Sequence, residues 1–272
     1  MESKKNFEYS PELYDLQVNW ALRISKEREL FEKIIATKNI RKILDIGCGT
    51  GHHVQLFSEI IDEIVAKKDL KDPGVINTKP LIVGMDPDEK MIKFAKENVV
   101  KSKVVKLIVG GFENLKNIKY DQFDFITCLG NTLALLGNRQ KVKMALKATR
   151  KKLIKGGIAL FQFLNFEPKM IKKERFYTPK TFIKDEFRYI TMKHFEYGKV
   201  KTVADFIKIK IDSLGNIAGF ENHTSYMCTL RKNMFLKMAK NSGFKKIELL
   251  SPGGNEEFDK RKHISLIAIL YN

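Results

Sequence analysis

The segment Arg-Lys-Ile-Leu-Asp-Ile-Gly-Cys-Gly-Thr-Gly, residues 41–51, joins a short apolar run to three closely spaced glycines. Ile43, Leu44 and Ile46 predict a buried parallel strand, because the run is too short for a helix and ends in glycine. The glycines let the backbone turn sharply and approach a ligand without a Cβ in the way. The apolar spacing from His52 to Val65 then predicts a helix. This order of strand, turn and helix is typical of the nucleotide-binding half of a doubly wound sheet.

The details of this segment narrow the class of ligand. A dinucleotide fingerprint needs a third glycine where His52 stands, and a phosphate-binding loop needs a Gly-Lys-Ser/Thr sequence that is missing. Asp45 places a carboxylate at the carboxyl end of the strand, where open α/β sheets bind ligands. A carboxylate there repels a pyrophosphate and suits a ligand with an ammonium group. For this segment alone, a tight turn in some other α/β protein remains the alternative.

Composition predicts a cytoplasmic protein with one sizeable core. The chain has 272 residues and 43% hydrophobic content, with no membrane-length apolar run and no apolar signal region at its start. Cys48, Cys128 and Cys228 lie far apart, which predicts reduced thiols and no metal site. The net charge of +18 is compatible with a nucleic-acid partner. The lysines are spread over nearly every segment, however, which favours general lysine usage over a nucleic-acid surface.

The first part of the chain alternates between strand-like and helix-like segments, which predicts a parallel sheet. An N-terminal helical segment is predicted at residues 10–36, with a cap near Ser10. The polar stretch 62–80 is interpreted as a loop-like insertion that delays the second strand. A basic helix over 139–155 is expected to end at Gly156-Gly157. The further strands are predicted at residues 81–85, 104–109, 123–128 and 158–164.

The pattern changes after residue 167. Runs rich in β-branched and aromatic residues at 187–197, 202–212 and 217–230 predict a three-stranded antiparallel insertion that caps the site. A helix over 231–242 and strands over 245–250 and 263–271 follow. We therefore expect an α/β fold with a doubly wound, mostly parallel seven-stranded sheet. Its core comprises residues 1–167 and 231–272, and the cap comprises residues 168–230.

Three segments, in this order, resemble motifs of the class I S-adenosylmethionine-dependent methyltransferases. They are Leu-Asp-Ile-Gly-Cys-Gly-Thr-Gly at 44–51, Val-Gly-Met-Asp-Pro-Asp-Glu-Lys-Met at 83–91 and Phe-Asp-Phe-Ile-Thr-Cys-Leu-Gly-Asn-Thr at 123–132. More narrowly, residues 128–132 and 164–167 look like the glycine N-methyltransferase-like branch, which includes sugar-amine N-methyltransferases. The resemblance covers most of residues 10–165. It implies a Rossmann-like methyltransferase with S-adenosyl-L-methionine as cofactor and S-adenosyl-L-homocysteine as product.

The resemblance also implies roles for individual residues. Gly47 and Gly49 would approach the methionyl and ribose parts of the cofactor, and Asp45 would hold its ammonium group. Asp86 would bind the ribose hydroxyls, and Arg23 would grip the cofactor carboxylate. The complete set of cofactor-binding residues implied in this way is Trp20, Arg23, Asp45, Gly47, Cys48, Gly49, Asp86, Pro87, Met91, Gly111, Phe112 and Leu129.

Two positions depart from the family pattern. Gly111 stands where the third motif usually carries an acid that reads the adenine amino group. Adenine recognition would then fall to backbone groups of Gly111 and Phe112, or to Glu113. Leu164 stands where the glycine-methylating enzymes have an arginine for the amino-acid carboxylate. A small amino acid held by its carboxylate is therefore disfavoured.

Methyl transfer from a sulfonium is an in-line displacement, so alignment and exclusion of water can suffice without a dedicated base. Asn131 and Asn165 are the candidates for orienting the acceptor, with loop capping as their alternative role. His194 and His223 are candidate bases if an amine binds protonated. We expect a small-molecule acceptor, with nitrogen favoured over oxygen, and no membrane partner. The alternatives are an RNA methyltransferase that uses the basic surface and a non-catalytic S-adenosylmethionine-binding protein.

Overall fold

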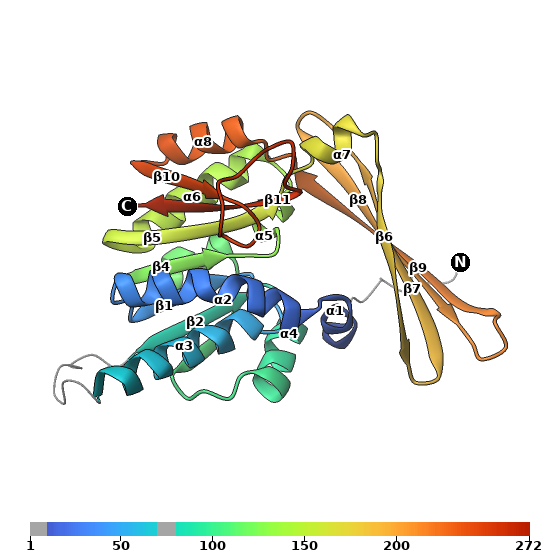
Figure 1. The fold of residues 1–272 in the computed structure, drawn as a ribbon, viewed down its shortest axis with the longest axis horizontal. Helices are drawn as coiled ribbons and strands as arrows, with labels where there is room; N and C mark the ends of the chain where they lie inside the picture. The colour runs from blue at the N-terminus through green and yellow to red at the C-terminus, as the bar shows by residue number, and fades with distance from the viewer. Residues whose placement is uncertain (1–9, 70–79) are drawn as a thin grey trace.

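The computed structural model describes residues 10–69 and 80–272, and its core is built on a seven-stranded sheet (Figure 1). The strands of this sheet are β1 Lys42–Ile46, β2 Leu81–Asp86, β3 Val105–Val109, β4 Phe123–Cys128, β5 Leu153–Leu164, β10 Lys246–Leu250 and β11 Ser265–Tyr271. They lie in the order β10-β11-β5-β4-β1-β2-β3, and β11 is antiparallel to both of its neighbours. The predicted mostly parallel sheet is confirmed. The strand order reverses between β1 and β4, which is where open α/β sheets bind ligands.

Helices cover both faces of this sheet. The helices of the described residues are α1 Pro11–Gln17, α2 Trp20–Thr37, α3 His52–Asp69, α4 Glu89–Phe94, α5 Thr132–Leu135, α6 Arg139–Lys152, α7 Glu167–Ile171 and α8 Lys232–Asn241, with a π-helical turn at Ala95–Val99 and a 3₁₀ helix at Phe112–Asn117. Phe31 of α2 and Phe57 of α3 belong to one buried cluster, whereas Val142 of α6 and Phe235 of α8 belong to another. The sheet is therefore wound on both sides, as the alternation of strands and helices predicts.

The N-terminal segment forms two helices rather than one. The Ser10 Oγ accepts a hydrogen bond from the Leu13 amide at 3.3 Å, so the predicted cap of α1 is confirmed. Val18 is extended and ends α1, and the Asn19 side chain then caps α2 by accepting from the Leu22 amide at 3.1 Å. This break lets α1 lie between the core sheet and the second sheet (Figure 1).

Two predicted boundaries are wrong. Helix α3 continues to Asp69, so the first part of the polar stretch 62–80 is helical, and residues 70–79 lie outside the described residues. The basic helix ends at Lys152, and β5 already begins at Leu153, so Gly156 lies inside a strand. Leu153 is buried and pairs with Phe123 of β4, and a register shift after that pair accommodates the glycines. Burial of Leu153 thus overrides the glycine stop signal.

The inserted segment forms a second sheet of four antiparallel strands: β6 Phe176–Lys184, β7 Phe187–Glu196, β8 Lys201–Ile211 and β9 Ile217–Cys228. The three predicted strands are β7, β8 and β9, and β6 is an additional strand that the sequence did not indicate. Pro179 weakens its strand pattern, and the register shifts between Tyr177 and Lys180. Proline is tolerated there because β6 is an edge strand. Whether residues 168–230 form a separate cap domain stays a prediction.

The three cysteines Cys48, Cys128 and Cys228 are buried and unpaired, as the sequence predicts. Among the described helices, none has the length and apolar character needed to cross a membrane.

Candidate functional site

The glycine turn after β1 is held against two neighbouring elements. Gly47 and Gly49 have φ angles of 75° and 54°, in the left-handed region that favours glycine. The amides of Gly47 and Cys48 donate to the Met85 carbonyl at 2.7 and 3.0 Å, which ties the turn to β2. A Cβ at Gly47 would lie only 2.4 Å from Cγ2 of Thr132, at the start of α5. A side chain at this position is therefore excluded by contact as well as by conformation.

Asp86 at the end of β2 presents its carboxylate to this turn. Its Oδ2 accepts from the Gly49 amide and its Oδ1 from the Asp88 amide, each at 2.9 Å. Burial raises the pKa of Asp86 in spite of these two bonds. Asp88, rather than Asp86, caps α4 by accepting from the Lys90 amide. Each carboxylate oxygen of Asp86 retains a further lone pair, so the group can still accept hydrogen bonds from a ligand.

Asp45 lies beneath the turn with only 1% of its surface exposed. The Thr127 hydroxyl of β4 donates to its Oδ1 at 2.7 Å. Burial raises the pKa of Asp45 to about 7, although the charge of Arg23 works in the opposite direction. A cationic ligand group close to Asp45 would favour its ionised form.

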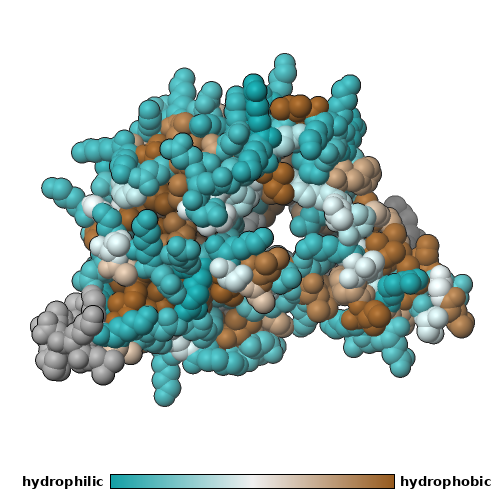
Figure 2. Space-filling view, viewed as in Figure 1, coloured by the Kyte–Doolittle hydropathy of each residue, from teal (hydrophilic) through white to brown (hydrophobic). Residues whose placement is uncertain are grey.

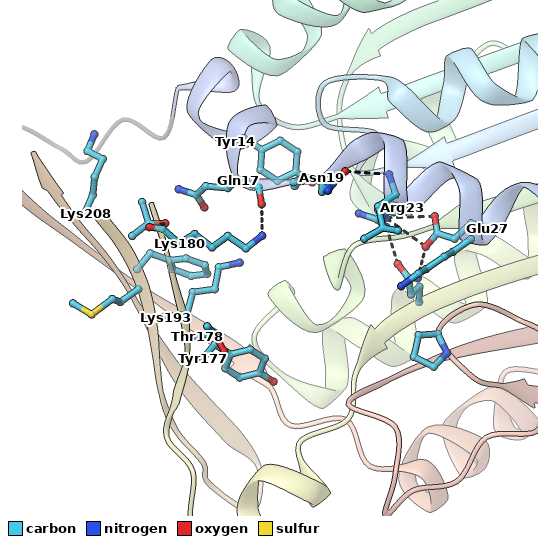
Figure 3. Close-up of a pocket in the computed structure, with 18 of the residues that line it drawn as sticks. Tyr14, Gln17, Asn19, Arg23, Glu27, Tyr177, Thr178, Lys180, Lys193 and Lys208 are labelled. Atoms are coloured by element: carbon cyan, nitrogen blue, oxygen red, sulfur yellow. Dashed lines mark hydrogen bonds and ion pairs between the residues drawn. The ribbon is translucent and has the colours of Figure 1, made fainter. Parts of the chain in front are cut away.

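Arg23 reaches from α2 toward the ends of β4 and β5 (Figure 3). Its Nη2 donates to Oε1 of Gln162 at 2.7 Å, and its Nε contacts Glu27 at 3.4 Å. The Gly130 amide donates to the same Gln162 oxygen at 3.2 Å. A Cβ at Gly130 would lie 3.8 Å from Nη1 of Arg23, so the guanidinium packs close to the backbone that follows β4. A guanidinium has five N–H groups, which leaves donors for an anionic ligand group.

Glu27 and Gln162 form a buried support that the sequence did not indicate. Gln162 donates from Nε2 to Glu27 at 2.7 Å, and His53 of α3 contacts Glu27 at 2.8 Å. Burial opposes ionisation of Glu27, but His53 and Arg23 outweigh it and lower its pKa. Burial also lowers the pKa of His53, so a neutral imidazole donates to an anionic carboxylate. The available signal was Gln162 itself, a polar residue inside the apolar run of β5.

The aromatic residue beside the glycine turn is Tyr14 rather than Trp20. A Cβ at Gly49 would lie 3.8 Å from Cε1 of Tyr14. Burial raises the pKa of the Tyr14 hydroxyl. Trp20 stacks on the His52 ring at a centroid distance of 4.3 Å and donates its indole N–H to Asp15 at 2.9 Å. Trp20 therefore packs on the first turn of α3, and α1 brings Tyr14 to the site.

In the expected adenine region, the carboxylate of Glu113 lies beside Gly111. The Gly111 amide donates to Oδ1 of Asn114 at 2.9 Å, and Phe112 is buried in the core. A Cβ at Gly111 would lie 2.9 Å from both carboxylate oxygens of Glu113. Glu113 thus occupies the space that a side chain at position 111 would take. Pro87 and Met91, the two other residues expected there, lie before and within α4, exposed and half-buried respectively.

The two candidate orienting asparagines lie in different surroundings. Asn131 has a φ of 76°, and its Oδ1 accepts from the Leu164 amide at 3.0 Å. The amide group of Asn165 donates to the carbonyls of Lys260 and His263 at 2.8 and 2.7 Å, which ties down a loop. Leu129 is buried below Asn131. The structure therefore brings Asn131 toward the site and gives Asn165 a capping position.

Two cavities lie between the core and the second sheet, where the space-filling view shows an opening (Figure 2). The first cavity, of about 560 Å³, is bordered by Arg23 and Glu27 of α2 and by Lys180 and Lys193 of the second sheet. The second, of about 460 Å³, is bordered by Asn131 and by residues of β5 and β9. Volumes of this size suit small organic ligands. Both cavities include Tyr14, Gln162, Tyr177, Lys193 and Phe206.

The two candidate bases lie on opposite faces of the second sheet. His194 contacts Asp205 at 3.0 Å through Nδ1 and packs against Phe176, away from both cavities. His223 borders the second cavity, with its Nε2 3.0 Å from the Ser225 hydroxyl. Of the two, His223 alone is placed to meet an acceptor in that cavity.

Comparison with known families agrees with this arrangement. A profile described as "Methyltransferase domain" matches residues 37–209, which is well over half of the chain. The chain belongs to the methyltransferase domain family. Its fold is that of the class I S-adenosylmethionine-dependent members, so the family expected from the sequence and its cofactor are confirmed. The match runs from the end of α2 into β8 and includes Asp45, Asp86 and Asn131.

Individual relatives within the methyltransferases are distant. A glycine/sarcosine N-methyltransferase of Aphanothece halophytica is 23% identical over 173 residues, which are 63% of this chain and 57% of that enzyme. The match therefore spans little more than half the length of this relative. An S-adenosylmethionine-dependent methyltransferase from Clostridium acetobutylicum shares the fold with a TM-score of 0.67 at 15% identity, over 96% of this chain and 94% of that one. S-adenosylmethionine-bound CalS10, an amino pentose methyltransferase from Micromonospora echinaspora, gives 0.68 at 15% identity, over 98% and 99% of the two chains.

Proposed function

We propose that this chain transfers a methyl group from S-adenosylmethionine to a small-molecule acceptor, with nitrogen as the favoured acceptor atom. The observation that carries the proposal is the set of groups around the glycine turn. Asp45 and Asp86 supply carboxylates and Arg23 supplies a guanidinium, while Gly47 and Gly49 leave the backbone accessible. An ammonium, a ribose diol and a carboxylate are the complementary groups, and S-adenosylmethionine carries all three.

The residues present fit this cofactor by the chemistry of their donors and acceptors. Asp86 would accept from the ribose hydroxyls, Asp45 would face the ammonium group and Arg23 would bind the carboxylate. Glu113, in the space above Gly111, would take the place of the missing acid at the adenine. When bound, the cofactor supplies an electrophilic methyl group on a sulfonium.

The contribution of the protein to the reaction is alignment and exclusion of water. Holding two reactants in a near-attack geometry contributes roughly 7–11 kcal/mol, so no dedicated base is required. Tyr14 connects the glycine turn to both cavities, so an acceptor in the second cavity would approach from the side of Asn131. If an amine arrives protonated, His223 is the residue placed to take its proton.

The choice of nitrogen rests on two kinds of support. The matched relative from Aphanothece halophytica is named as an N-methyltransferase, and CalS10 is described as an amino pentose methyltransferase. In this chain, the second cavity is lined mainly by apolar and aromatic side chains such as Phe163, Phe195 and Met227. A neutral amine, which is the nucleophilic form, is stabilised over its protonated form in such surroundings.

The donor site can be tested by calorimetric titration of S-adenosylmethionine into matched variants. Asp86→Asn should weaken binding by about tenfold or more, because charge-assisted hydrogen bonds contribute roughly 1.5–3 kcal/mol. Asp88→Asn is the control, since asparagine caps a helix as well as aspartate does and the change in charge is the same. Equal affinities of both variants and the parent would overturn the assignment of Asp86.

A labelled-methyl assay on a metabolite extract, with and without its RNA, then separates a small-molecule acceptor from RNA and from absence of catalysis.

A further inference from the structure

The face of the second sheet that borders the first cavity carries two adjacent cross-strand rows. In one row, Lys180 pairs with Thr191 and Thr191 pairs with Lys208. In the next, Lys193 pairs with Phe206. Thr191 and Lys193 lie two apart on β7 and therefore point to the same side of the sheet. All five residues border the first cavity, so the register of β6, β7 and β8 brings three lysines to one wall.

The charge of this cavity is strongly positive. Its cationic lining residues come from both sides of the space and are Arg23, Lys26, Lys180, Lys193 and Lys208. Among the described residues that line the cavity, one is acidic, and it is Glu27. Glu27 is already occupied by Arg23, His53 and Gln162, so it does not neutralise the wall formed by the second sheet.

Among the residues that the structure describes, two of the three lysines on that wall lack a carboxylate partner. Lys208 pairs with Glu221 at 2.6 Å. Lys180 instead donates to the main-chain carbonyl of Gln17 (Figure 3). Nζ of Lys193 lies 5.3 Å from the centroid of the Phe206 ring. Within the described part of the chain, neither Lys180 nor Lys193 has a carboxylate at ion-pair distance. Desolvation by the surrounding protein lowers the pKa of Lys193, and so does the positive charge of Lys180. The side chain of Lys193 is nevertheless exposed to the cavity.

We propose that the methyl acceptor carries an oxyanion, a phosphate or a carboxylate, which binds between Lys180 and Lys193 in the first cavity. The inference rests on the proposed function, because it describes the acceptor of that reaction. Lys193 and Tyr177 border both cavities, and the Tyr177 hydroxyl is buried with no hydrogen-bond partner among the described residues. An acceptor anchored at Lys193 can therefore extend past Tyr177 into the second cavity, beside Asn131.

The test uses simple anions on the full chain. Inorganic pyrophosphate, inorganic phosphate and acetate are titrated calorimetrically at constant ionic strength, with S-adenosylmethionine absent and at saturation. At least one anion should bind, and Lys193→Met and Lys180→Met should each weaken it by about tenfold or more, because a charge-assisted contact is lost. Lys147→Met removes the same charge from the exposed face of α6 and should leave the affinity unchanged. Tighter binding of the phosphates indicates a phosphorylated acceptor, and tighter binding of acetate indicates a carboxylate.

Three results would overturn the inference: no binding of any anion, equal affinity in parent and both lysine variants, or displacement of the anion by S-adenosylmethionine. The last result would assign the lysines to the cofactor. Affinity for S-adenosylmethionine, measured in the same variants, should not change. If the cofactor fails to bind while the anion binds through Lys193, the proposed function fails and the anion site stands. If the cofactor binds and no anion does, the proposed function stands and the anion site fails.

Discussion

Gln162 connects three elements through one amide group. Its oxygen accepts from Arg23 and from the Gly130 backbone, and its nitrogen donates to Glu27. The orientation of Arg23 is therefore fixed by a strand on the other side of the site, and the guanidinium does not depend on a ligand for its position. Such support places a charged group in advance and lowers the cost of ordering it when a ligand binds.

Asp45 should make the stability of the protein depend on pH. Its pKa in the folded state is about 7, against an ordinary value of 3.8, so between these values the folded state binds more protons than the unfolded state. The stabilisation of the folded state that comes from the raised pKa of Asp45 is therefore fully present below pH 4, and it is lost as the pH rises toward 7. The loss amounts to about 4 kcal/mol at about 1.4 kcal/mol per pKa unit.

Urea unfolding of the parent and of Asp45→Asn, at several pH values from 4 to 8, measures this loss. Asparagine keeps an acceptor for the Thr127 hydroxyl and does not titrate. The difference in unfolding free energy between parent and variant should fall as the pH rises, while titration of other groups cancels. A difference that stays constant over this range would show that Asp45 has an ordinary pKa.

The part of the site that lies in continuous motifs could be predicted from the sequence. Asp45 lies in β1, Gly47 and Gly49 come just after it, and Asp86 ends β2. Glu27 and Gln162 were not predicted, because they meet across 135 positions in the chain and neither belongs to a local pattern. Tyr14 was within an expected helix, but its approach to Gly49 depends on the break between α1 and α2.

At the scale of elements, the contact between α2 and α3 includes one buried carboxylate beside its apolar core of Phe31 and Phe57. Glu27 of α2 accepts from His53 of α3 and also from Arg23 and Gln162. Glu27→Ala should lower the free energy of unfolding by about 3–5 kcal/mol, because it leaves several buried polar groups without a partner. Glu29→Ala, on the exposed side of the same helix, should change it by less than about 0.5 kcal/mol. Urea denaturation followed by circular dichroism measures both, and similar values for the two variants would refute a structural role of Glu27.

Element types were predicted more successfully than element boundaries. The strands of the core sheet have continuous apolar patterns, since both of their faces are covered by helices. Strand β6 was missed because an exposed edge strand with a proline has little apolar signal. The sequence does not indicate the start of β5, because the glycines at 156 and 157 resemble a helix stop. The boundary is set instead by the pairing of Leu153 with Phe123.

At the scale of the whole molecule, the net charge of +18 comes from lysines that are spread over nearly every segment of the chain. Hydrophilic side chains cover most of the face seen in Figure 2. We expect RNA to bind weakly and to dissociate steeply as the salt concentration rises from about 50 to 200 mM, because phosphate contacts release counterions. Methyl label from S-adenosylmethionine should not enter the RNA. Filter binding and scintillation counting of purified RNA measure the two quantities, and label in RNA would favour an RNA acceptor over a small molecule.

The stacking of Trp20 on His52 has a practical consequence for experiments on this chain. Trp20 is the single tryptophan of the sequence, and its indole lies at the junction of α1, α2 and α3. Indole emission is sensitive to the groups that touch the ring, so any displacement of these helices will change the fluorescence of the whole protein. Stopped-flow mixing can therefore follow, in real time and without an added dye, the binding of any ligand that displaces these helices.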